Sequence, residues 1–142
     1  MTKSLNKFYN PNPLKKITDD SVVRALAKAT NSEWDTVYTA LYEIGTGLKV
    51  MPDSKESYEQ FLKDRGFTYT GISTKKGSKR PTVEKFTKAN KKGTYVIRVA
   101  HHVVTAVDGF YFDTWDSGHK AMYGYWTKPD EGTQSASDKT GN

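Results

Sequence analysis

A histidine and an aspartate lie on either side of a strong hairpin signal near the end of the chain. Asp108-Gly109 is typical of a two-residue β-hairpin loop, and the segments that flank it are rich in β-branched and aromatic residues. With these two residues in the loop, Val107 lies opposite Phe110. His102 and Asp113 then become diagonal neighbours on one face of the hairpin, within reach of each other's side chains. A carboxylate in that place holds an imidazole in one tautomer and stabilises its charged form, as a general base requires.

The hairpin register decides which histidine faces the acid. In this register His101 points to the opposite face, toward Asp116, and a slip of one residue would exchange the two histidines. A purely structural hydrogen bond between a half-buried His102 and Asp113 is the alternative interpretation, because ion pairs of this kind need not be functional.

Ser21 is the candidate nucleophile for such a base. It follows Asp20 at the start of an amphipathic segment that predicts a helix from about Asp20 to Thr30. A side chain there lies near free N–H groups and the positive end of the helix dipole, which stabilise a developing anion. The simpler interpretation is that Ser21 satisfies a backbone donor, as many serines at helix starts do. We expect Thr18 or Asp19 to cap this helix, with Arg24 and Lys28 on the side away from the apolar stripe.

The remaining pattern predicts helices first and strands afterwards. Helices are expected over 32–44, ended by Gly45 and Gly47, over 54–65 after a capping box of Asp53 and Glu56, and over 81–89. Strands are expected over 67–73, 95–99, 103–107, 110–115 and 122–126, whereas residues 1–17 are expected to be irregular. This order predicts an α+β fold with one domain over residues 1–126 and a disordered polar tail over 127–142.

Two segments of this chain resemble a family. Residues 20–30, D-S-V-V-R-A-L-A-K-A-T, look like the D-C-V-V-R-A-L-A-x-A-T opening of small papain-like cysteine peptidase-like proteins of bacteriophages and prophages. Residues 102–116 are similar to their H-V-V-x-x-V-D-G-x-x-x-D-T-W-D segment, and the order of the motifs matches double-glycine bacteriocin-processing peptidases. The resemblance covers about residues 20–126. It implies a papain-like fold, with N-terminal helices packed on a C-terminal antiparallel sheet, and acyl transfer on an amide bond of a peptide or protein.

The resemblance also implies roles for individual positions. Ser21 takes the place of the nucleophilic cysteine, His102 that of the general base and Asp113 that of the orienting acid. Trp115 would form a wall of the site, and Val23 and Trp34 would pack the helix on the sheet. The glutamine that usually supplies an oxyanion donor has no match, because Lys15 and Lys16 stand there, with Asn10 and Asn12 further upstream.

Serine at position 21 is the largest departure from the family pattern. A hydroxyl is a far weaker nucleophile than a thiol beside an imidazole, so we expect weak or no turnover. Three explanations are open, ranked in this order: an engineered cysteine-to-serine substitution, a natural non-catalytic relative, and a working serine variant. The chain contains no cysteine at all, and Ser117 is a candidate for a second position at which relatives carry one, which favours a natural loss.

The amino-acid composition limits which kinds of molecule the chain is expected to bind. The chain of 142 residues has a net charge of +6, and without cysteine it has no disulfide, thiolate metal site or iron–sulfur cluster. Lysines and arginines concentrate between Lys75 and Lys92, so the alternative function is a non-catalytic phage protein that binds a host protein or nucleic acid through this basic surface. Nucleic acid is not favoured, since no aromatic side chain lies between Thr74 and Thr82 to stack on bases.

No cofactor, metal or membrane is expected. The predicted register does not bring three ligands from His101, His102, His119, Asp113 and Asp116 onto one face. No segment approaches the roughly 20 apolar residues that cross a bilayer, and no apolar stretch follows the basic residues at the N-terminus. We therefore expect a cytoplasmic protein, located in the host cytoplasm if a phage encodes it.

Overall fold

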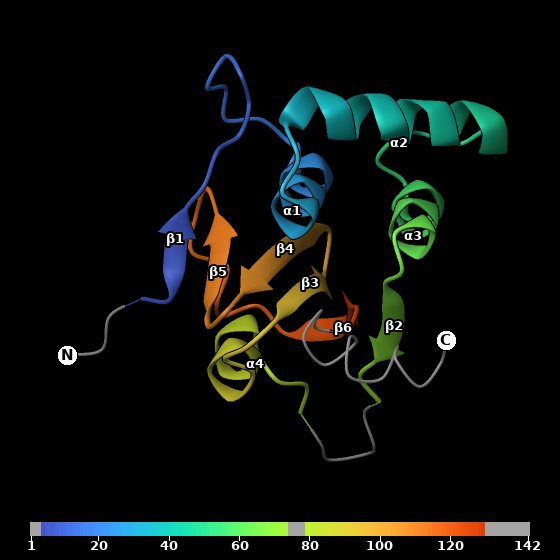
Figure 1. The fold of residues 1–142 in the computed structure, drawn as a ribbon. Helices are drawn as coiled ribbons and strands as arrows, with labels where there is room; N and C mark the ends of the chain where they lie inside the picture. Colours follow the sequence, from blue (N-terminus) through green and yellow to red (C-terminus); the bar gives the residue numbers. More distant parts are fainter. Residues whose placement is uncertain (1–3, 74–78, 130–142) are drawn as a thin grey trace, which may run out of the picture.

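The computed structural model describes residues 4–73 and 79–129, which form four helices around one six-stranded sheet (Figure 1). The helices are α1 (Ser21–Thr30), α2 (Trp34–Leu48), α3 (Lys55–Asp64) and α4 (Val83–Ala89). The strands are β1 (Asn6–Phe8), β2 (Thr68–Gly71), β3 (Thr94–Val99), β4 (His102–Val107), β5 (Phe110–Asp113) and β6 (Met122–Thr127). The fold is therefore α+β, and β6 runs one residue past the predicted end of the domain. Residues 130–142 of the predicted tail lie outside the described residues.

The strands are arranged in the order β1-β5-β4-β3-β6-β2. All neighbours are antiparallel except β1, which pairs in parallel with β5 and sets Asn6 opposite Tyr111. Two expectations are corrected here, because residues 6–8 are not irregular and the sheet is mixed. Three residues with no apolar alternation give no strand signal of their own, and β1 forms because the edge of β5 offers unpaired backbone groups.

The hairpin that connects β4 and β5 has the predicted register. Val107 lies opposite Phe110, and both loop residues have positive φ, 49° for Asp108 and 91° for Gly109, as a type I′ turn requires. β5 ends at Asp113, two residues earlier than expected, so Trp115 lies in the following loop. On the other side of β4, Val99 pairs with His102, and this leaves Ala100 and His101 as a tight turn.

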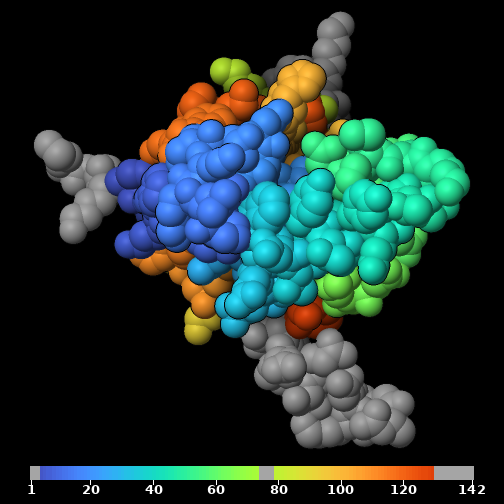
Figure 2. Space-filling view, turned by 90° about the horizontal axis from the view of Figure 1, so that it is seen from above, coloured from blue at the N-terminus to red at the C-terminus, as the bar shows by residue number. Residues whose placement is uncertain are grey.

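Helices cover both faces of the sheet. Helices α1, α2 and α3 lie over one face, and α4 lies on the other (Figure 1). The two cores follow the strand alternation, since Val96 and Val103 face α1 whereas Ile97 and Val104 face α4. Helix α1 is also fixed by a polar contact, because the Thr105 hydroxyl donates a 2.7 Å hydrogen bond to the Ala25 carbonyl. Viewed from above, the N-terminal segment, α2 and α3 form one continuous surface (Figure 2).

The helix ends differ from the expected ones. The residue before α1 is Asp20 and it makes no side-chain cap, while α3 is capped by Ser54 instead of Asp53. Helix α2 continues through Gly45 and Gly47 to Leu48. Gly45 is needed for close packing, since a Cβ there would lie 2.7 Å from the Val50 carbonyl oxygen. The segment that follows α2 therefore folds back against the helix.

No helix within residues 4–73 and 79–129 has the length and apolar character needed to cross a membrane.

Candidate functional site

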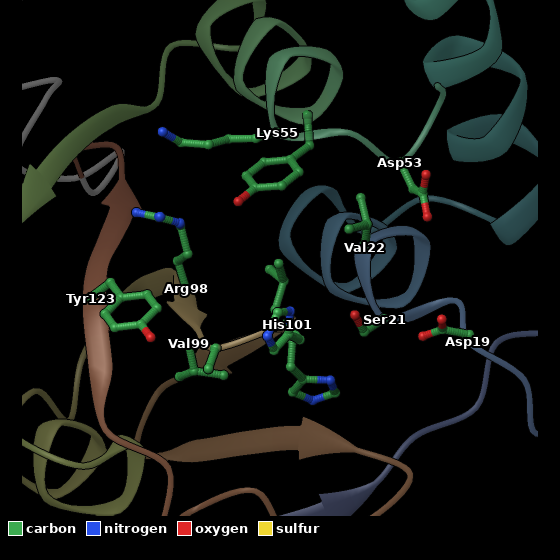
Figure 3. A pocket seen from close by; sticks show the side chains of 13 residues that line it. Asp19, Ser21, Val22, Asp53, Lys55, Arg98, Val99, His101 and Tyr123 are labelled. Carbon is green, nitrogen blue, oxygen red and sulfur yellow. The ribbon is translucent and has the colours of Figure 1, made fainter. Parts of the chain in front are cut away.

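A cleft of about 540 Å³ opens between the start of α1, the β3–β4 turn and the start of α3 (Figure 3). The side chains of Ser21 and His102 both line it. Residues from four segments of the chain complete its walls: Asp19, Val22, Asp53, Lys55, Tyr58, Arg98, Val99, Ala100, His101, Val103 and Tyr123. The fold thus brings two of the three candidate catalytic residues to one cleft, although 81 positions separate them in the sequence.

Ser21 is the first residue of α1 and is 9% exposed. Figure 3 shows its side chain at the end of the helix that faces the cleft. The first intrahelical bond runs from the Arg24 N–H to the Asp20 carbonyl, so the preceding N–H groups have no acceptor within the helix. These N–H groups and the helix dipole make the surroundings of Ser21 favourable for negative charge.

His102 contacts Asp113 as the register predicted. The His102 Nε2 atom lies 2.6 Å from Asp113 Oδ2, and both side chains are largely buried. This contact uses Nε2, so Nδ1 is the ring nitrogen left for another partner. The Trp115 ring covers the imidazole at a centroid distance of 4.8 Å. Trp115 thus forms a wall beside His102 even though it lies outside the strand.

Asp113 is buried, and its carboxylate accepts hydrogen bonds from several residues. Besides His102, it accepts hydrogen bonds from the Ser117 hydroxyl at 2.7 Å, the Thr114 N–H at 2.8 Å and the Arg24 guanidinium at 3.0 Å. Burial alone would raise the pKa of Asp113, but the hydrogen bonds from His102 and Ser117 outweigh it and lower this pKa. Asp113 is therefore held as a carboxylate, the form that supports an imidazolium.

Arg24 links this acid to the helix that carries Ser21. Its guanidinium forms an ion pair with Asp20 through Nη1 and with Asp113 through Nη2, and Asp20 also accepts a 2.9 Å bond from the Trp34 indole. The expectation that Arg24 faces away from the apolar side is wrong, because this residue is 4% exposed. The helix periodicity predicted that Arg24 lies on the same side as Lys28. It could not show that a buried carboxylate on the sheet faces Arg24. The Asp20–Arg24 spacing of four residues was the available signal.

Asp20, Arg24 and Asp113 form one buried group of charges, and His102 bonds to its Asp113 end. Two carboxylates, Asp20 and Asp113, flank one guanidinium, so a net negative charge remains on the group. Had Arg24 faced Asp113 alone, it would have neutralised the acid. The second carboxylate, Asp20, lies next to Ser21 in the chain.

Sequence reasoning missed several residues of the cleft. Lys55 and Arg98 form its cationic side, and Asp19 and Asp53 its anionic side (Figure 3). Tyr58 lies between α3 and the sheet, where burial raises its pKa to about 12 in spite of the nearby Arg98. The sequence offered Asp19 and Asp53 only as helix caps, and the packing of α1, α3 and β3 brings these residues together.

The other candidate residues lie away from this chemistry. Asn10 and Asn12 do not line the cleft; their side chains bond to the backbone of Lys16 and Leu14 within the N-terminal segment. Within the described residues, no group of three or more His, Asp or Glu side chains has the geometry to hold a metal ion. The basic stretch is described only in part, because residues 74–78 lie outside the described ranges.

No family model matches this chain, and no curated protein or solved structure matches it either.

Proposed function

We propose that this protein has the papain-like fold and an amide-hydrolase type of site, with Ser21 at the nucleophile position, His102 as the base and Asp113 as the orienting acid. One observation carries the proposal: Ser21 at the start of α1 and His102 line one cleft, and His102 is bonded through Nε2 to a buried carboxylate. The packing of α1 on β4, which includes the hydrogen bond from Thr105 to Ala25, supports it by fixing the helix that carries Ser21 against the strand that carries His102.

In the proposed reaction, His102 Nδ1 takes the hydroxyl proton while Ser21 Oγ attacks the amide carbonyl carbon of a peptide or protein. The carbonyl oxygen becomes an oxyanion, stabilised by the backbone N–H groups at the start of α1. The C–N bond then breaks, and His102 returns the proton to the leaving amine. Water, activated by the same histidine, hydrolyses the resulting ester and restores the hydroxyl.

Asp20 and Arg24 act as positioning residues in this scheme. Asp20 precedes the nucleophile, and Arg24 joins it to Asp113, which holds His102. The nucleophile and the base are therefore fixed to each other through one buried chain of charged hydrogen bonds. Such supporting contacts set the orientation of a reacting pair, which is where small displacements cost most in rate.

Serine limits the rate in this site. A hydroxyl is almost fully protonated at neutral pH, whereas a cysteine thiol in the same place would ionise beside the imidazole. We therefore expect the chain to bind its substrate and to turn it over slowly or not at all.

The test is to install a thiol at the nucleophile position. Because the chain has no other cysteine, Ser21→Cys carries a single thiol whose alkylation by iodoacetamide can be followed by mass spectrometry. At pH 6 we expect alkylation at least about tenfold faster than for Ser73→Cys, an exposed control with the ordinary thiol pKa near 8.5. Adding His102→Ala should remove most of this difference.

Two results of this experiment would contradict the proposal. If the thiol of Ser21→Cys reacts no faster than that of Ser73→Cys, or if its rate is unchanged by His102→Ala, the histidine does not activate this position. The chain would then be a non-catalytic binding protein, the alternative function predicted from its basic surface.

A further inference from the structure

A second pocket adjoins the cleft on the side of α2. Its volume is about 240 Å³, below the range of about 300–1,000 Å³ typical of sites for whole small molecules, and it suits a single side chain. It shares Asp19, Val22 and Asp53 with the cleft, so the two spaces are continuous along the start of α1. Of the residues that line this pocket, only Asp20 has a role in the proposed acyl transfer.

The pocket has an aromatic wall. The rings of Trp34 and Tyr38 are stacked at a centroid distance of 5.2 Å with an interplanar angle of 5°. Tyr38 is 44% exposed and Met51 is 68% exposed, so both of these lining side chains are open to a ligand. Flat aromatic faces attract guanidinium and ammonium groups, and a thioether adapts to an aliphatic stem.

The charges of the pocket contrast with those of the chain. The chain carries +6, yet three aspartates and no Lys, Arg or His line the pocket. Asp20 is already bonded to Arg24 and Trp34. Asp19 and Asp53 are exposed and form no ion pair or side-chain hydrogen bond with any other residue in the described ranges. Figure 3 shows Lys55 and Arg98 on the far side of the cleft, away from these two carboxylates.

The rim that carries Asp53 is held in place before any ligand arrives. The Val50 N–H donates to the Gly45 carbonyl at 3.0 Å, which the absent side chain of Gly45 permits. The Met51 carbonyl then accepts from the Ser54 N–H at 3.0 Å and from the Ser57 hydroxyl at 2.8 Å. A preformed pocket loses less conformational entropy on binding than one that must order itself.

We propose that this pocket binds the cationic side chain of an arginine or lysine in a peptide, with the guanidinium or ammonium group between Asp19 and Asp53 and the stem against Trp34 and Tyr38. The assignment to a peptide substrate rests on the proposed function. A peptide substrate bound in this way would carry a basic residue within a few positions of the amide bond that Ser21 attacks. Binding of the cation itself does not depend on catalysis.

Binding is tested first on the unmodified chain. Nα-acetyl-arginine methylamide is titrated while the assigned indole N–H signal of Trp34 is followed by NMR, with the citrulline analogue as a neutral ligand of the same shape. We expect saturable shifts with arginine and at least tenfold weaker binding of citrulline. Asp53→Asn should remove most of this preference, whereas Glu43→Gln, an exposed carboxylate of α2 outside the pocket, should keep it. Equal binding of the two ligands, or none of either, overturns the proposal.

The place of the pocket in catalysis is tested on Ser21→Cys. Peptidyl chloromethyl ketones carry arginine or citrulline at one of the three positions before the electrophile; the thiolate introduced at position 21 displaces chloride and forms a thioether. We expect arginine to react at least tenfold faster than citrulline at one position. If iodoacetamide labelling depends on His102 but the two probes react equally, the subsite is wrong and the proposed function stands. If arginine binds selectively but labelling ignores His102, the pocket stands and the proposed function fails.

Discussion

The carboxylate that bonds to His102 and the two carboxylates at the rim of the second pocket are in opposite environments. Asp113 is 1% exposed and all its neighbours are donors from the chain itself, including His102, Ser117 and Arg24. Asp19 and Asp53 lie in solvent at the rim of the second pocket and form no ion pair within the described residues. The same functional group is thus fully bonded in one region and available in the other.

This difference separates groups that hold the fold from groups that are free to bind a ligand. A buried carboxylate is tolerated only when donors replace the water it has lost, so each partner of Asp113 contributes to stability. An exposed carboxylate keeps its water and contributes little to folding, so it is free to exchange that water for a cation. Substitutions in the buried region should therefore mainly change the free energy of unfolding, whereas substitutions at the pocket should mainly change ligand binding.

Removal of the buried guanidinium should have the largest effect. Arg24→Met leaves Asp20 and Asp113 buried without their shared cation, and loss of one partner from a buried ion pair typically costs about 3–5 kcal/mol. We expect a loss of that size in the free energy of unfolding, measured by urea denaturation. Arg98→Met is the matched control, because this half-exposed arginine bonds to the Tyr69 hydroxyl near the surface. Equal losses for the two variants would contradict the difference between the regions.

Acid should destabilise the fold next, through the buried Asp113 and the exposed but hydrogen-bonded Asp116. Hydrogen bonds lower the pKa of Asp113 against its burial, and hydrogen bonds from Tyr111 and Ser4 lower the pKa of Asp116. The unfolded chain then binds more protons than the folded chain around the ordinary Asp pKa near 3.9, so stability rises with pH in that range. Stabilisation is complete above that pKa and is lost as the pH falls through the lower folded values.

Urea unfolding between pH 6 and pH 2 measures this loss. The variant Asp19→Asn keeps both Asp113 and Asp116 and should retain most of this loss. A stability that stays constant below pH 4 would show that these two acids are not stabilised by folding.

The sequence contained most of the information for the His102–Asp113 contact. A two-residue turn with positive φ at both positions has a specific chemical signature, and Asp108-Gly109 supplies it. Once the turn is fixed, strand alternation decides which side chains meet. Helix α1 was predicted within one residue for the same reason, because its apolar period is local.

The features that were not predicted depend on contacts between distant segments. β1 exists only against β5, and Gly45 is required by the segment that returns to α2. Arg24 was assigned to the surface because a helix pattern shows polarity but not the buried carboxylate of Asp113. The acidic pocket combines a helix start, an aromatic pair and a loop, and no periodicity connects them.

The smallest effect on stability is expected from the exposed carboxylates of the pocket. Asp19 and Asp53 each lie just before a helix start, where a negative charge stabilises the helix by about 0.3–1 kcal/mol. Asp19→Asn and Asp53→Asn should therefore each cost less than about 1 kcal/mol in urea unfolding, and about 0.5 M salt should reduce even that loss by screening. A cost comparable to that of Arg24→Met would mean that these acids hold the fold, and the pocket would then lose its free charge for a cation.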